Sequence, residues 1–158
     1  MVGSRKAERR DAEAVPRWPR FDDGHRPRVL IEHPDPLGQQ VLADAFRERG
    51  YEALTCGGPS AHGATMTQCP VVMGDHCPAV DGADVVVSSL QAGQGVEARV
   101  IQGIVADPIG PPLLLEATGW QLQQADLAGE VEARCYPFQS PSKVVDRVEE
   151  LLRETSSE

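Results

Sequence analysis

Three of the four cysteines lie close together in the sequence and are the residues best suited to chemistry. Cys56, Cys69 and Cys77 are 13 and 8 residues apart, and two of them begin copies of a short repeat, Cys69-Pro-Val-Val-Met-Gly74 and Cys77-Pro-Ala-Val-Asp-Gly82. Thiolates bind zinc and iron–sulfur clusters, and a pair of thiols can form a disulfide. The proline and glycine turns of the repeat indicate that each thiol is held in a defined position.

Histidines near these cysteines are candidates for a fourth metal ligand. Three thiolates and one imidazole would complete a tetrahedral zinc site. His76 directly precedes Cys77 and is our first choice, with His33 and His62 as alternatives. The sequence lacks the CxxC pair that is typical of zinc sites. Three interpretations therefore stay open: a zinc or iron–sulfur site, a redox pair, and reduced thiols that only pack the loop.

Composition and charge limit the class of protein. Hydrophobic residues make up 41% of the 158 residues and charged residues 25%, as in ordinary globular domains. No apolar run is long enough to span a bilayer, and the N-terminus lacks the apolar region of a secretory signal. We therefore expect a cytoplasmic protein that does not enter membranes and whose cysteines are mostly reduced.

Charge divides the chain into a basic start and an acidic body. Residues 1–28 contain 8 Lys and Arg against 5 Asp and Glu, whereas residues 29–158 contain 7 against 19. A body this acidic disfavours nucleic acid as its partner. Residues 1–27 show no apolar periodicity and are expected to form a disordered basic arm, followed by a domain over residues 28–154 and a flexible tail over residues 155–158.

Strands and helices alternate from residue 28 onward. Apolar runs predict strands at residues 29–31, 51–55, 84–87, 112–115 and 132–136. Helices are predicted between Asp35 and Gly50, over residues 96–105 and 120–127, and after Ser140-Pro141. Five strands joined by helical crossovers predict an α/β fold with a doubly wound parallel sheet.

The order of these segments resembles a response-regulator receiver domain, the flavodoxin-like module of two-component signalling. The resemblance covers about four-fifths of the chain and lies in RVLIEHPDPLGQQVLADAFRERGY, ADVVVSSL, PPLLLEAT and YPFQSPSKVVDRVEELL. It implies a five-stranded sheet in the order 2-1-3-4-5. The second helix of that family is replaced here by a Cys-, Gly- and Pro-rich loop over residues 57–82.

The resemblance also implies that phosphorylation has been lost. The two acidic positions after the first strand hold His33 and Pro34, and the phosphoacceptor position holds Ser89. Ala117 occupies the switch position, and Tyr136 replaces the lysine that would pair with the phosphoryl group. Without clustered carboxylates and a cation, neither magnesium binding nor acyl-phosphate chemistry is expected. The chain is therefore similar to a pseudo-receiver.

Strand order also groups the candidate ligands. In the order 2-1-3-4-5, His33 approaches Cys56, whereas Cys135 lies on the far strand and is expected to be a buried thiol outside the cluster. Cobalamin-binding domains share the architecture, but the histidine motif that they need after the first strand is absent. No set of residues typical of an enzyme active site emerges.

The prediction is a non-enzymatic, phosphorylation-independent signalling module that acts through protein contacts, with another protein or a second copy of the chain as partner. The alternative is a small metal- or redox-sensing protein that uses the loop of Cys56, Cys69 and Cys77.

Overall fold

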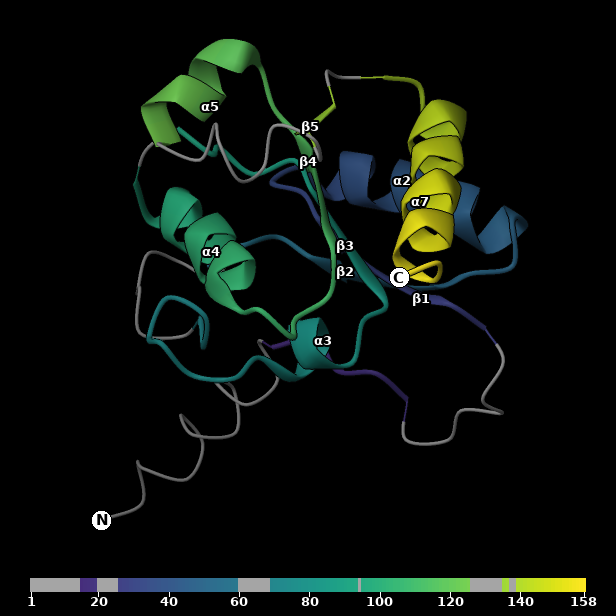
Figure 1. Cartoon of the computed structure of the whole chain (residues 1–158), viewed down its shortest axis with the longest axis horizontal. Coiled ribbons are helices and arrows are strands. Elements are labelled where there is room, and N and C mark those ends of the chain that lie inside the picture. The colour runs from purple at the N-terminus through teal and green to yellow at the C-terminus, as the bar shows by residue number, and fades with distance from the viewer. Residues whose placement is uncertain (1–14, 20–25, 60–68, 94, 126–134, 137–138) are drawn as a thin grey trace.

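The protein is an α/β domain in which helices cover both faces of a parallel sheet (Figure 1). The computed structural model describes residues 15–19, 26–59, 69–93, 95–125, 135–136 and 139–158. The strands are β1 (Arg28–Glu32), β2 (Glu52–Cys56), β3 (Val85–Ser88), β4 (Leu113–Glu116) and the two-residue β5 (Cys135–Tyr136). Their order across the sheet is β2-β1-β3-β4-β5, and every neighbouring pair is parallel.

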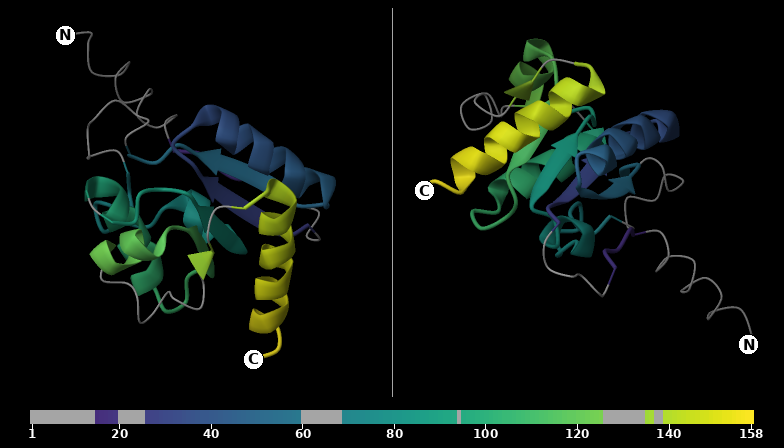
Figure 2. Two further views of the ribbon diagram at one scale, coloured as in Figure 1. Left: turned by 90° about the horizontal axis from the view of Figure 1, so that it is seen from above. Right: turned by 90° about the vertical axis from the view of Figure 1, so that its right-hand side faces the viewer.

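Five helices lie within the described residues. They are α2 (Pro36–Glu48), α3 (Pro78–Asp81), α4 (Gly95–Ala106), α5 (Gly119–Ala125) and α7 (Pro141–Thr155). The two further views separate the layers: α2 and α7 lie on one side of the sheet, and α3 and α4 lie on the other (Figure 2). Each face of the sheet thus has a core of its own.

Local sequence explains where α2 begins and ends. The Asp35 carboxylate accepts the Leu37 N–H at 3.2 Å, and Pro36 follows at the first helical position, where no backbone N–H is needed. Gly50 follows the helix with a φ of 88°, a conformation that favours glycine. Asp35 and Pro36 thus set where α2 begins after β1, and Gly50 marks where it ends.

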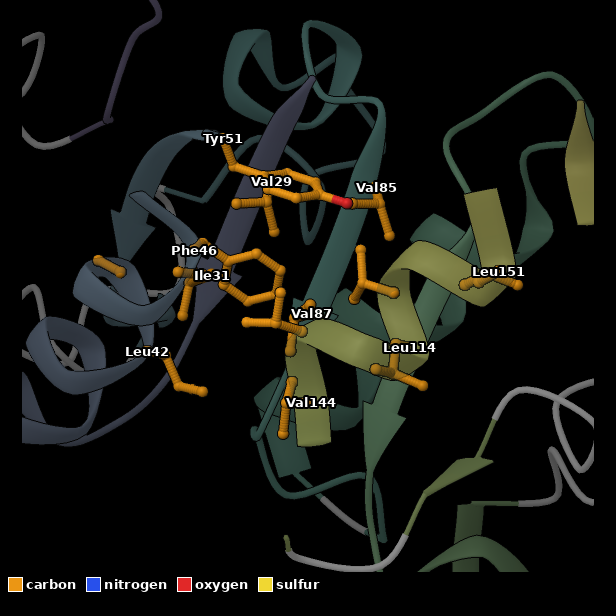
Figure 3. Close-up of a cluster of buried hydrophobic side chains, with 13 residues drawn as sticks. Val29, Ile31, Leu42, Phe46, Tyr51, Val85, Val87, Leu114, Val144 and Leu151 are labelled. Carbon is orange, nitrogen blue, oxygen red and sulfur yellow. The ribbon is translucent and has the colours of Figure 1, made fainter. Parts of the chain in front are cut away.

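The face under α2 and α7 has a core of apolar side chains (Figure 3). Phe46 is completely buried there and meets Tyr51 edge-to-face, with ring centroids 5.2 Å apart. The α7 residues facing it are Val144, Val145, Val148 and Leu151. Arg49, at the end of α2, adds ion pairs to Asp146 and Glu149 of α7.

The opposite face combines apolar side chains with thiols. Leu30, Val86 and Leu115 of the sheet pack there against Ile101 and Val100 of α4. Partly buried side chains at the edge of this core include Trp18, Cys56, Cys69 and Cys77. All three cysteines of the loop therefore lie on the same face of the sheet.

The α/β class, the parallel sheet and the order of its first four strands are confirmed. The predicted fifth strand, residues 132–136, is represented by the two residues of β5, because residues 132–134 lie outside the described part of the chain. The loop that was expected to replace the second helix contains the one-turn helix α3. Within the described residues, no helix is both long and apolar enough to cross a membrane.

The N-terminal arm differs in part from expectation. Residues 15–19, which we call the strap, lie against the domain, and the Trp18 indole N–H donates to the Ala79 carbonyl at 2.8 Å. Because a single aromatic residue makes this contact, the strap has no periodic apolar pattern from which its docking could be predicted. At the other end, α7 reaches Thr155, one residue beyond the predicted domain boundary.

Candidate functional site

The carboxyl ends of three neighbouring strands place polar side chains in one row. The register pairs Glu32 of β1 with Cys56 of β2 on one side and with Ser88 of β3 on the other. Neighbouring strands lie about 4.8 Å apart, so these side chains are adjacent. The row lies on the α3/α4 face, because Glu32 shares the face of Leu30. In open α/β sheets, this edge is where ligands usually bind.

Glu32 is the most unusual residue of the row. Its side chain is only 3% exposed, and its Oε1 atom has no hydrogen-bond partner among the described residues. Burial raises the pKa of the Glu32 carboxyl from 4.5 to about 7, against a hydrogen bond from Ser88 that lowers the pKa, while the nearby charge of Glu97 raises it further. Below pH 7 this carboxyl is therefore mostly neutral.

The two copies of the Cys-Pro repeat fold into the same kind of turn. The Cys69 carbonyl accepts the Met73 N–H at 3.2 Å, and the Cys77 carbonyl accepts the Asp81 N–H at 2.9 Å. In each copy the cysteine precedes the turn and proline occupies its first position. The repeat therefore acts as a structural unit that presents a thiol at the start of a helical turn.

A single cavity of about 30 Å³ is lined by Cys69 and Cys77 of the repeat together with Cys56 and Glu32. We call this cavity the thiol pocket. The volume is that of about one water molecule. Apart from these residues, the lining is almost entirely apolar and includes Val15 and Pro16 of the strap. The pocket is small and poor in hydrogen-bond partners, and the three cysteines that line it are partly buried.

Burial makes two of the thiols poor nucleophiles. It raises the pKa of Cys56 to about 12, although the Gly58 N–H, 3.4 Å from Sγ, works in the opposite direction. Burial also raises the pKa of Cys77, against the N–H groups of Val80 and Ala79. Both side chains are therefore protonated thiols at neutral pH, and Cys56, Cys69 and Cys77 are all free.

The histidines do not join the thiols. The backbone N–H of His33 donates to the Cys56 carbonyl, but its ring packs against Gly38 and its Nδ1 accepts the Asp35 N–H at 3.0 Å. The His76 side chain is 91% exposed and pairs with Asp81 at 3.4 Å. His62 lies outside the described residues. His33 thus approaches Cys56 through its backbone, whereas its ring turns toward α2.

A preformed metal site is not assembled from these side chains. Within the described part of the chain, no group of three His, Cys, Asp or Glu residues is arranged to hold a metal ion. The side chain of Cys135 lies outside the described part, although its backbone pairs with Leu115 of β4, far across the sheet from β2. The predicted set of Cys56, Cys69, Cys77 and His76 is thus reduced to three thiols around one pocket.

A second buried acid lies at the end of β4. Burial raises the pKa of Glu116, against a hydrogen bond with the Ser89 hydroxyl. Glu116 follows Leu115, so it lies on the α2/α7 face, opposite the thiol pocket. Its Oε1 atom, like that of Glu32, has no described hydrogen-bond partner. Ser89, the residue at the phosphoacceptor position of the resemblance, is thus bonded to a buried glutamate.

The other positions singled out by the resemblance have structural roles. Ala117 is buried in the core beneath α4, and Pro34 lies in the exposed turn before α2. Thr118 caps α5: its hydroxyl accepts the Gln121 N–H, and its own N–H donates to the Gln121 side chain. For Tyr136, the structure describes the backbone pairing with Glu116.

Sequence reasoning missed both glutamates. Each ends a short apolar run, RVLIE in β1 and LLLE in β4. An acid at that place usually reaches solvent, so only its burial in three dimensions distinguishes it. No protein-family model matches the chain, and no curated protein matches it.

Proposed function

We propose that this protein is a non-enzymatic regulatory module with receiver-like architecture, which works through protein contacts and without phosphorylation. The observation that carries the proposal is the chemistry at the carboxyl edge of the sheet. Magnesium and acyl-phosphate chemistry need ionised, accessible carboxylates. Here Glu32 and Glu116 are both buried, and burial raises the pKa of each carboxyl.

The residue at the phosphoacceptor position supports the same proposal. A serine hydroxyl needs a base before it can attack a phosphoryl donor. The partner of the Ser89 hydroxyl is Glu116. Burial raises the pKa of this carboxyl and so favours its protonated form, which cannot accept the hydroxyl proton. With His33 turned onto α2, no described imidazole contacts Ser89 either.

The alternative functions receive less support. A metal sensor needs three or more grouped ligands, and the described residues contain no such group. A peroxide sensor needs a thiolate, whereas burial raises the pKa of Cys56 and Cys77. What favours a thiol function is only that the three cysteines share one pocket.

Phosphotransfer can be tested directly. The full chain is incubated with acetyl phosphate and magnesium, and its intact mass is measured before and after. We expect no phosphoryl adduct on the wild-type protein. A Ser89→Asp variant tests whether restoring the carboxylate alone is enough, and we expect it to stay unmodified. An adduct on the wild-type chain that disappears in Ser89→Ala would contradict the proposal.

A further inference from the structure

The strap connects the N-terminal arm to the thiol pocket. Val15 and Pro16 form part of the pocket lining, together with Cys56, Cys69 and Cys77. Removing the strap would therefore open one wall of the pocket. None of the other described segments that line the pocket lies outside the domain that begins at β1.

Trp18 anchors the strap to the helix that follows Cys77. Its indole N–H donates to the carbonyl of Ala79, which is a residue of α3 and itself lines the pocket. The indole also rests on Gly82, where a Cβ atom would lie 2.5 Å from Trp18 Cδ1. Ala79 and Gly82, both in the second copy of the Cys-Pro repeat, form the contact surface of Trp18, which we call its seat.

Arg28 holds the strap from the other side. Its guanidinium carbon lies 5.2 Å from the centre of a Trp18 ring, and Nη2 donates to the Pro19 carbonyl at 3.4 Å. Glu52 of β2 orients this guanidinium through a 3.1 Å contact with Nε. The same arginine therefore contacts both the anchor and the end of the strap.

Glu32 is a polar residue of the thiol pocket that lacks a hydrogen bond from the described residues at one of its carboxyl oxygens. Glu32 lines the cavity, and its buried Oε1 atom has no described partner, so entry of water or a polar group that reached this atom would relieve an unfavourable burial. Closure consequently depends on the packing and hydrogen bonding of the strap rather than on the pocket's own polar groups. The strap is thus the described element outside the sheet-and-helix domain that covers part of the thiol pocket.

We propose that the strap is a gate, and that Cys56, Cys69 and Cys77 form a modification site for small disulfides that is accessible only after Trp18 leaves its seat. The proposal does not depend on the receiver-like function. In the modification, a loop thiol gives its proton to water and attacks one sulfur of a disulfide RS–SR. The S–S bond breaks, a mixed disulfide forms on the protein, and RS⁻ leaves.

The modification would also hold the gate open. A cavity of about 30 Å³ cannot contain an organic thiol attached to a cysteine. The strap could not return to its closed position until the mixed disulfide is reduced. Small disulfides would thereby control whether the strap is docked on the domain.

Two substitutions disturb the seat from opposite sides. Trp18→Ala removes the indole from the strap, whereas Gly82→Ala adds a methyl group beneath it without changing the strap. Gly82 has a φ of −88°, which alanine adopts readily. Arg17→Ala is the matched control, because Arg17 is an exposed strap residue next to the anchor.

The test measures the reaction of the full-length protein with dithiobis(nitrobenzoate), an aromatic disulfide. Peptide mass spectrometry of the quenched samples gives the rate at each cysteine separately. We expect the three loop thiols to react about ten-fold faster or more in Trp18→Ala and Gly82→Ala than in the wild type, because a hydrogen bond and apolar burial are lost. Arg17→Ala should react at the wild-type rate.

Urea separates gating from unfolding. If the strap is the gate, the enhanced rates in the two variants should depend weakly on low urea concentrations, since opening exposes little surface. The proposal is overturned if both variants react at the wild-type rate or if Arg17→Ala is accelerated equally. It is also overturned if the enhanced rates show the full urea dependence of global unfolding measured by circular dichroism.

Discussion

The two faces of the sheet bury different kinds of side chain. Under α2 and α7, long apolar side chains such as Phe46 fill the core, and Figure 3 shows them converging from both helices and the sheet. Under α3, the core continues into three thiols and the carboxyl of Glu32. The first face depends mainly on hydrophobic contacts, with the buried Glu116 carboxyl at the end of β4, whereas the second contains several groups whose protonation and accessibility can change.

This contrast assigns separate roles to the two faces. Close packing of apolar side chains gives stability that is largely independent of redox conditions, and the pH dependence of this face comes from Glu116. A buried carboxyl and buried thiols give a region that responds to both pH and redox conditions. We therefore expect substitutions on the α2/α7 face to affect mainly stability, and substitutions around the thiol pocket to affect mainly pH dependence and thiol accessibility.

The largest effect should come from the apolar face. Phe46→Ala removes a fully buried ring and its edge-to-face contact with Tyr51. We expect the free energy of unfolding to fall by about 3–5 kcal/mol, measured by urea denaturation at fixed pH. The loss should be similar at pH 5 and pH 7.5. A loss that varied strongly with pH would show that the two faces are not independent.

Glu32→Gln should change the pH dependence of stability. Because burial raises the pKa of Glu32 from 4.5 to about 7, the folded protein keeps a proton that the unfolded chain has lost between these values. Unfolding free energy should therefore fall as the pH rises from 4.5 to 7, by at most about 3 kcal/mol. Glu32→Gln should remove most of this slope.

A smaller slope should persist in Glu32→Gln, because burial raises the pKa of Glu116 in the same direction. Glu48→Gln, at the exposed end of α2, is the matched control and should keep the wild-type slope. The interpretation of Glu32 fails if its substitution leaves the stability profile between pH 4.5 and 7 unchanged.

Gly103→Ala should disturb the pocket through α4. A Cβ atom at Gly103 would lie 2.6 Å from Val71 Cγ1, in the turn that follows Cys69. The turn has to shift, at a cost of about 1–3 kcal/mol in unfolding free energy. Unlike Phe46→Ala, this variant should also raise the alkylation rate of Cys69. An unchanged alkylation rate of Cys69 would show that a shift of the turn does not affect the thiol pocket.

Cys56→Ala should have the smallest effect on stability. It removes one buried sulfur atom and a weak contact with the Gly58 N–H, so we expect a loss of about 1 kcal/mol by urea denaturation. A thiol that held a metal or a structural disulfide would cost several kilocalories per mole when replaced. A loss of that size would favour the metal- or disulfide-based alternative over simple packing.

The sequence predicted the elements with strong local signals. Asp35, Pro36 and Gly50 mark the ends of α2 unambiguously, and the β-branched run of β3 identifies a strand buried on both faces. The grouping of Cys56 with the two repeat cysteines also followed from chain order. These features depend on neighbours in the sequence, which is why they could be read from it.

The features that were missed depend on contacts between distant residues. Trp18 docks on Ala79, 61 positions away, from a segment without periodicity. The α3 turn has four residues, too few for a helical pattern to emerge. The unusual state of Glu32 arises from Ser88, Glu97 and the covering loop, none of which is adjacent in sequence.

The carboxyl edge of the sheet buries Glu32 and Glu116, and burial favours their protonated forms over an anionic cation site. Carbon-13 NMR of the side-chain carboxyl groups measures this directly, with the Glu32 signal assigned by its absence in Glu32→Gln. We expect the Glu32 signal to titrate with a midpoint near pH 7 in the folded protein, because burial raises its pKa to about that value. A midpoint near 4.5, the ordinary value, would mean a solvated carboxylate that is available to a cation, and would contradict the account.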